Sequence, residues 1–340
     1  MRQPDPDATI IVARKRPPAG TGRRIGLAAA VAAAVLIAGG GVGYILLHKP
    51  TAPTPPAAVP LAPVAPLAPA PPLAKPVPPP MAQLGERAIL AQRAEDWIAV
   101  RFAANPRILV VDFPTLTAQG RAFNRMAAFL EKLGLPRDRV LDDQELNTAI
   151  GRDQATVETY YYGHDYRAAD VARFFATADL QGVRLLPDER RLRGILQQEG
   201  LLAAGINAAV ISIPREGSDP FVDASGRASL LRHELSHGEF FTNPDYATFA
   251  RRFWANDMSE TDRARFREFL TRQGYEPHDE DLLINEMQAH LMHTTDVRYF
   301  NARDCGIPAP RVAMLRARFA ETMPRNWLHE ATALALPRLP

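Results

Sequence analysis

The chain is almost without cysteine and almost without net charge. Cys305 is the only cysteine among 340 residues, so no disulfide can form within the chain and no cysteine-based zinc site can exist. In an oxidising compartment a single thiol is either buried or reactive, and we expect burial. Forty basic and thirty-eight acidic residues leave a net charge of +2, which gives no electrostatic case for nucleic acid as a partner.

Proline, in contrast, is abundant, and most of the 31 prolines fall in one stretch. Residues 48–80 are rich in Pro and Ala, a composition that favours polyproline II and cannot build a packed core. At about 3.1 Å per residue, this linker can hold the next domain several tens of ångströms from its point of attachment. We therefore interpret it as a spacer.

A long uncharged segment precedes the linker. Residues 25–47 form an apolar run of 23 residues, which as a helix would span about 34 Å, enough for a bilayer core of about 30 Å. The run is longer than the apolar core of a cleaved signal peptide and ends without a small-residue cleavage site. Residues 1–24 contain six basic residues and are interpreted as a cytoplasmic tail. The sequence thus predicts a single-pass membrane protein with a signal anchor and an exported domain, periplasmic or extracellular.

The globular part, residues 81–340, is expected to be an α+β domain. Two short apolar runs, 107–112 and 208–213, are each followed closely by a proline and predict buried strands. The first half should therefore hold a small sheet, and the second half should be mostly helical. Helices are expected at 83–103, 117–132, 167–178, 187–199, 226–241, 244–255, 259–273, 280–295, 310–322 and 326–335.

The most informative segment is an HExxH motif at residues 233–237. Positions i and i+4 of a helix lie on one face, so His233 and His237 can both reach one ion at about 2.0–2.1 Å, as zinc prefers. Glu234 lies about 100° further round the helix, outside the ligand set but within reach of a water on the metal. The motif predicts a site in which Glu234 acts as general base on zinc-bound water.

A catalytic zinc needs a third protein ligand and one open position. Phe240 and Asn243 stand where the metzincin pattern requires glycine and histidine, so that subclass is excluded. The other usual donor is a carboxylate on a later helix, and Glu286 provides one. His290 and His293 on the same helix are alternative ligands, with Glu286 preferred over His290.

The pair Asn285-Glu286, on a helix after HExxH, resembles the gluzincin metallopeptidases, in which this Glu completes the zinc site. The resemblance covers the two motif segments. It implies a zincin-like fold, with His233, His237 and Glu286 as ligands of Zn²⁺ and Glu234 as catalytic base. His290 stands where these enzymes have an aspartate that orients a ligating histidine. The candidates to replace that carboxylate are Glu239, Asp279, Glu280 and Asp281.

Peptide hydrolysis also needs a donor for the developing oxyanion. Tyr299 is the first choice, although a role in core packing is equally consistent with its sequence position. The other candidates are Tyr246, His278 and His293.

The strand at 208–213 precedes the motif by about twenty residues. It is either an edge strand that pairs with an extended substrate, as in zincin-type folds, or an interior strand. The tyrosine-rich run 160–166 is unusual, but the sequence assigns it no role.

The sequence as a whole predicts a membrane-anchored zinc-dependent hydrolase, most simply a metallopeptidase that acts on peptides or proteins. Its partners would be that substrate and the membrane, through one N-terminal helix, with no nucleic acid. The alternative is a non-catalytic envelope protein that has a structural or degenerate metal site and serves as a binding module.

Overall fold

The computed structural model describes residues 80–335. The predicted tail (1–24), the predicted membrane anchor (25–47) and all but the last residue of the predicted linker (48–80) lie outside the described residues. Within 80–335, no helix combines the length and the apolar character that a membrane crossing requires.

A five-stranded mixed sheet lies in the first half of the described chain. Its strands are β1 (Gln83–Leu84), β2 (Ile98–Phe102), β3 (Ile108–Phe113), β4 (His164–Arg167) and β5 (Ala209–Pro214). The order across the sheet is β1-β2-β3-β5-β4. β1 runs parallel to β2 and β3 runs parallel to β5, whereas the β2–β3 and β4–β5 pairs are antiparallel. β4 is therefore an edge strand of this sheet.

Both faces of the central strands are buried, which explains why β3 and β5 are continuous apolar runs. On one face, Ile108 and Val110 of β3 pack with Leu231 and Leu235 of the motif helix. On the other face, Leu109 and Val111 belong to the larger core formed with the helices of the first half. Successive residues of a strand point to opposite faces, so β3 joins the two cores.

Helices make up most of the remaining described chain. They are α1 (Glu86–Leu90), α2 (Leu116–Leu130), α3 (Asp143–Arg152), α4 (Ala168–Leu180), α5 (Pro187–Gln198), α6 (Ala224–Thr242), α7 (Pro244–Asn256), α8 (Glu260–Gln273), α9 (Glu280–Gln288), the π-helix η1 (Ala289–His293), α10 (Ala302–Cys305), α11 (Ala309–Thr322) and α12 (Trp327–Ala335).

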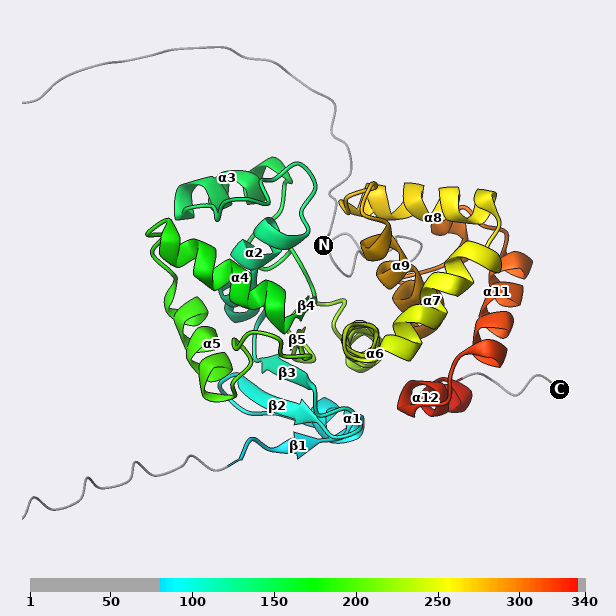
Figure 1. Ribbon diagram of the computed structural model, residues 1–340, viewed down its shortest axis with the longest axis horizontal. Coiled ribbons are helices and arrows are strands. Elements are labelled where there is room, and N and C mark those ends of the chain that lie inside the picture. Colours follow the sequence, from blue (N-terminus) through cyan, green and yellow to red (C-terminus); the bar gives the residue numbers. More distant parts are fainter. Residues whose placement is uncertain (1–79, 336–340) are drawn as a thin grey trace, which may run out of the picture. The chain divides into compact units, whose positions relative to one another are not determined.

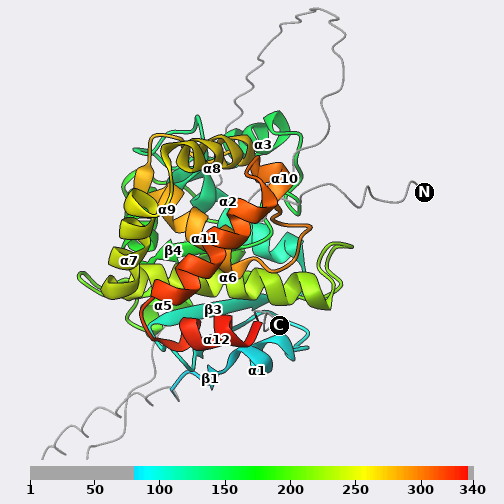
Figure 2. The same ribbon diagram turned by 90° about the vertical axis from the view of Figure 1, so that its right-hand side faces the viewer.

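Helix α6 is the central element of the arrangement. Figure 1 shows it nearly end-on, with the sheet and α2–α5 on one side and α7, α8, α9 and α11 on the other. It packs on β4 and β5 through one side and against α7, α9 and η1 through the other. Figure 2 shows α6 along its length beside β3. A residue on α6 can therefore contact both the sheet and the C-terminal helices.

The α+β prediction, with a small sheet followed by a mostly helical second half, is confirmed. The helix predicted at 83–103 is wrong, because this segment forms β1, α1 and β2. Strand β5 lies between β3 and β4, so the prediction of an interior strand at 208–213 is the correct alternative. The edge of the sheet next to β5 is formed by β4.

Candidate metal centre

The HExxH motif lies in the middle of α6. The helix begins after Asp223, whose side chain accepts a hydrogen bond from the amide of Gly226 and so caps the first turn. Leu231 and Leu235 attach the helix to the sheet, whereas His233 contacts Thr294 after η1, and His237 lies between Glu286 of α9 and Asp165 of β4. Both histidines are at most 1% exposed.

The second segment of the centre is α9 with its continuation η1. Asp279 caps α9 by accepting from the amide of Leu282. Glu286 lies in α9, and His290 lies one turn later, where the helix widens into a π-helix. Single π-helical turns are rare and occur often at functional sites. η1 packs on α6, which brings His290 to the motif histidines.

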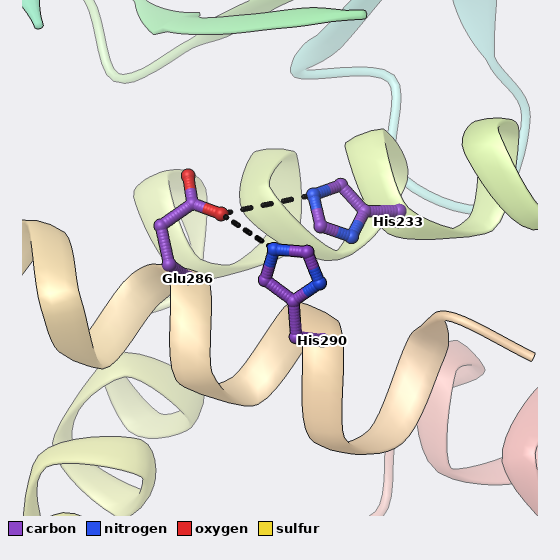
Figure 3. Close-up of side chains that lie close together, drawn as sticks. All are labelled: His233, Glu286 and His290. Atoms are coloured by element: carbon purple, nitrogen blue, oxygen red, sulfur yellow. Dashed lines mark ion pairs between the residues drawn. The ribbon is translucent and has the colours of Figure 1, made fainter. Parts of the chain in front are cut away.

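Four potential metal donors meet between these helices. The Nε2 atoms of His233 and His237 are 2.9 Å apart. Glu286 Oε2 lies 3.8 Å from His233 Nε2, and Glu286 Oε1 lies 3.7 Å from His237 Nε2. His290 Nε2 lies 3.6 Å from Glu286 Oε2. Figure 3 shows His290 beside His233, with one nitrogen of each ring turned toward the carboxylate of Glu286. The predicted ligands are thus brought together, with His290 beside them.

Two overlapping groups of side chains can each hold a metal ion: His233, Glu286 and His290 form one, and Asp165, His237 and Glu286 form the other. Glu286 Oε2 is buried and has no hydrogen-bond partner among the described residues. A buried carboxylate oxygen without a partner is costly, and a cation bound there would satisfy it. Neutral imidazoles and a carboxylate are donors that zinc accepts, so the residues fit such an ion.

The hydrogen bonds of Thr294 set the tautomer of His233. The Thr294 hydroxyl donates to the carbonyl of Ala289 at 3.0 Å, and His233 Nδ1 lies 2.7 Å from the same hydroxyl. Since the only hydroxyl proton is used on Ala289, the oxygen accepts from Nδ1–H of His233. His233 Nε2 is then left with its lone pair directed at the cluster, as a ligand requires.

His237 faces the sheet through its other nitrogen. Its Nδ1 lies 3.7 Å from Oδ1 of Asp165, on edge strand β4. Burial lowers the pKa of His237 to about 4, and a hydrogen bond with Asn285 acts in the opposite direction. The imidazole is therefore neutral near pH 7, as metal binding requires.

The catalytic base that the motif predicts, Glu234, lies against the segment before β4. A Cβ at position 163 would overlap Glu234 Oε1, so only glycine allows the backbone to approach the carboxylate this closely. Glu234 Oε2 has no hydrogen-bond partner among the described residues. The two residues line a small recess with Glu131, Tyr161, Asp165, His233 and Tyr275.

Burial dominates the electrostatics of the centre. It raises the pKa of Glu234 and of Glu286 well above the usual range, and the neighbouring carboxylates add to this effect. It lowers the pKa of His290 to about 3, with His237 contributing. In the absence of a cation, the carboxylates therefore favour the protonated form and the imidazoles the neutral form.

The structure places Tyr299 elsewhere. Its hydroxyl donates to the carbonyl of Phe221 at 2.6 Å, and its ring packs with Tyr162 and Val222 in a separate apolar group. The core-packing alternative considered for Tyr299 matches this environment. Of the other oxyanion candidates, Tyr246 and His293 are bonded to each other, 3.0 Å apart, and His278 is exposed.

The four carboxylates proposed as orienting groups have other partners. Glu239 accepts from Asn105 and Trp327. Asp279 caps α9, Glu280 accepts from Trp254, and Asp281 pairs with Arg251.

The sequence analysis missed three residues that border the cluster: Asp165, Tyr275 and Thr294. A hydrogen bond from Tyr275 to Glu286 opposes the rise that burial causes in the pKa of the carboxyl group. The only available signal was the unusual run at 160–166, which contains Gly163 and Asp165. Nothing local marks Tyr275 or Thr294, because both reach the cluster through tertiary packing.

Comparisons with protein-family models, with curated proteins and with solved structures each find no match for this chain.

Proposed function

We propose that the chain is a zinc-dependent hydrolase, specifically a metallopeptidase with a zincin-like catalytic domain. The observation that carries the proposal is the proximity of His233 and His237 to each other and to the two oxygens of Glu286, with Glu234 beside them. A structural ion would need the three donors but not a buried, unpartnered carboxylate at this position. The proposed substrate is a peptide or protein.

In this proposal each residue has a separate task. Zinc, when bound, polarises a carbonyl and lowers the pKa of water. His233, His237 and Glu286 hold the ion, and Thr294 fixes the ligating tautomer of His233. Glu234 takes the proton from the attacking water and returns it to the leaving group.

A groove beside β4 is the proposed approach for substrate. It has a volume of about 220 Å³ and runs between β4, the end of α6 and the start of α9. Glu131 and Asp165 line both this groove and the recess at Glu234, so the two are adjacent. As an edge strand of the described sheet, β4 can offer backbone hydrogen bonds to an extended peptide. We assign to β4 the role considered for 208–213.

The proposed location follows from the sequence alone. A signal anchor at 25–47 and a spacer at 48–80 would leave the domain exported, periplasmic or extracellular, on a single-pass membrane protein. This part of the proposal depends on residues outside 80–335.

A structural metal site in a non-catalytic binding protein is the second candidate. The enclosure of the centre favours it: His233, Glu286 and His290 are each 1% exposed. A catalytic centre has to admit substrate, so as a hydrolase the domain must open along the β4 groove.

Replacement of Glu234 by Gln tests the proposal. The full chain would be purified with zinc, and hydrolysis of fluorescently labelled casein would be measured. Because the change removes the base but no ligand, the zinc content should stay near one ion per chain, while turnover should fall by about 10²–10⁴-fold.

The matched control is Glu239→Gln, the same change on the same helix. Glu239 contacts Asn105, Asn243 and Trp327 rather than the cluster, so this variant should retain turnover. A wild-type chain that takes up no zinc rejects the metal site. Turnover that is unaffected by Glu234→Gln rejects the assigned base, and a zinc-loaded wild-type chain without turnover supports the binding role.

A further inference from the structure

We infer that His290 is a fourth protein ligand of the ion, so that one divalent transition-metal ion is held by three imidazoles and one carboxylate. The inference rests on the metal-binding part of the proposed function and not on hydrolysis. It concerns the residue at which the chain departs from the gluzincin pattern.

The distance from His290 Nε2 to Glu286 Oε2 is that expected of two ligands of one ion. Donors 2.0–2.1 Å from a tetrahedral zinc are about 3.4 Å from one another. The separation of 3.6 Å between His290 Nε2 and Glu286 Oε2 is close to this value and too long for a good hydrogen bond. The corresponding distances from Glu286 to His233 and His237 are 3.8 and 3.7 Å. His290 therefore stands to Glu286 as the two motif histidines do.

Within residues 80–335 the Nδ1 atom of His290 is unpaired, and its Nε2 atom faces the cluster. Its side chain is buried, and its Nδ1 has no hydrogen-bond partner among the described residues. The ring packs edge-on against His233 with centroids 4.8 Å apart, so Nε2 is held toward the cluster. A buried imidazole whose Nδ1 has no partner and whose Nε2 is 3.6 Å from a carboxylate is poorly satisfied unless an ion occupies the point that Nε2 faces.

His290 is not needed to orient a ligating histidine. In the gluzincin pattern the residue at this position orients a ligating histidine. Here Thr294 already accepts from His233 Nδ1, at 2.7 Å. Thr294 reaches this place because η1 adds a π-helical turn, in which its amide bonds to the carbonyl of Ala289 five residues earlier. With the orienting task taken by Thr294, His290 is free to act as a ligand.

His293, in the same π-helix, shows what a structural histidine looks like. It is equally buried, but its Nε2 lies 3.0 Å from the hydroxyl of Tyr246, so its bonding capacity is used within the protein. The two residues differ in their partners and not in burial. His293 is therefore the matched control for His290.

Four protein ligands leave no open position on a tetrahedral ion. Water can then enter only as a fifth ligand or in place of a protein ligand. The resting centre is therefore closed.

The test compares zinc affinity in the full chain with His290→Ala, His290→Cys and His293→Ala. Bound metal is removed by chelation, and Zn²⁺ is titrated in competition with a chromophoric chelator. His290→Ala should weaken binding by more than the roughly 10–100-fold that loss of an outer partner costs. Because a thiolate also binds zinc, His290→Cys should recover most of the affinity, and His293→Ala should stay within a few-fold of wild type.

The visible absorption of the Co²⁺-loaded protein gives a second readout. Its band positions and intensity depend on the number and type of ligands, so His290→Ala should change the spectrum and His293→Ala should not. Equal zinc affinity and an unchanged Co²⁺ spectrum in His290→Ala would overturn the inference and leave the proposed function intact. If the wild-type chain binds neither ion, the proposed function itself fails.

Discussion

Helix α6 carries two buried polar groups that differ in how fully their bonding capacity is used. Near its start, Arg227 is 1% exposed and donates to both oxygens of Asp112, at 3.0 and 2.9 Å, and to the carbonyls of Pro214 and Ile89. The two charges cancel, although the Nε of Arg227 has no hydrogen-bond partner among the described residues. Two turns later, the metal centre is equally buried.

The metal centre lacks this compensation of charge. Among the described residues, Glu234 and Glu286 form no ion pair with Lys or Arg, and each has an oxygen without a hydrogen-bond partner. The separations between donors are mostly those around an ion and not those of direct hydrogen bonds. Burial alone thus does not separate the structural network from the proposed binding site, whereas the lack of a Lys or Arg counter-charge does.

The largest expected effect is on the structural network. Asp112→Ala leaves the guanidinium of Arg227 buried without its counter-charge, which should cost about 3–5 kcal/mol of unfolding free energy. Urea denaturation of the metal-free chain measures it. Glu286→Gln provides the comparison in the same assay, because it replaces a carboxyl group whose pKa burial raises with a neutral amide of similar shape. Its cost should be about 1 kcal/mol or less.

An equal loss of stability in Asp112→Ala and Glu286→Gln would contradict the distinction between the two groups. So would a metal-free Glu286→Gln chain that is the less stable of the two. The comparison needs metal-free protein, since a bound ion would add its own stabilisation to one of the two variants.

Local signals in the sequence predicted the central elements of the fold. Strands β3 and β5 appear as apolar runs because both faces of the sheet are covered, and α6 to α9 match helices expected at 226–241, 244–255, 259–273 and 280–295. The segment 83–103 was misread because its Ala, Leu, Glu and Gln residues favour helix locally. Pairing of Ile98–Phe102 with β3 overrides that preference. Strand β4 has only four residues, and its pairing with β5 defines it.

The residues of the candidate site also divide into those that local sequence relates and those that only tertiary packing brings together. The relation between His233, Glu234 and His237 follows from helix geometry and needs no tertiary information. Glu286 could be proposed because its own helix is regular. Thr294 could not, because the π-helical turn that brings its hydroxyl to His233 has no sequence signature. The sequence thus allowed the donors to be proposed, and Thr294, which orients one of them, emerged only from the packing of η1 on α6.

A smaller expected effect is the stabilisation that zinc gives to the folded chain. An ion that binds only the folded state adds about 2.7 kcal/mol at a free concentration 100 times its Kd. The measurement is the urea unfolding free energy in zinc and in chelator. Asp112→Ala should keep this increment because its partner is Arg227, whereas Glu286→Gln should lose most of it. An increment that survives Glu286→Gln would place the ion elsewhere in the chain.

The smallest expected effect is that of replacing Thr294. The hydroxyl of Thr294 has its hydrogen bonds satisfied, yet it acts on the metal centre through His233. Thr294→Val keeps the shape but removes the acceptor for His233 Nδ1–H, so the ring loses the bond that fixes its ligating tautomer. Zinc affinity should fall by about tenfold, or about 1.4 kcal/mol, toward the low end of the effects seen for such partners.

Thr294→Ser retains the hydroxyl and serves as the control for Thr294→Val. It can still donate to the carbonyl of Ala289 and accept from His233, so its zinc affinity should remain within a few-fold of wild type. Chelator competition measures both variants, with metal-free unfolding as a check that the end of η1 is intact. If Val and Ser weaken zinc binding equally, the methyl packing of Thr294 matters and its hydroxyl does not. The tautomer of His233 would then have to be fixed by the ion itself.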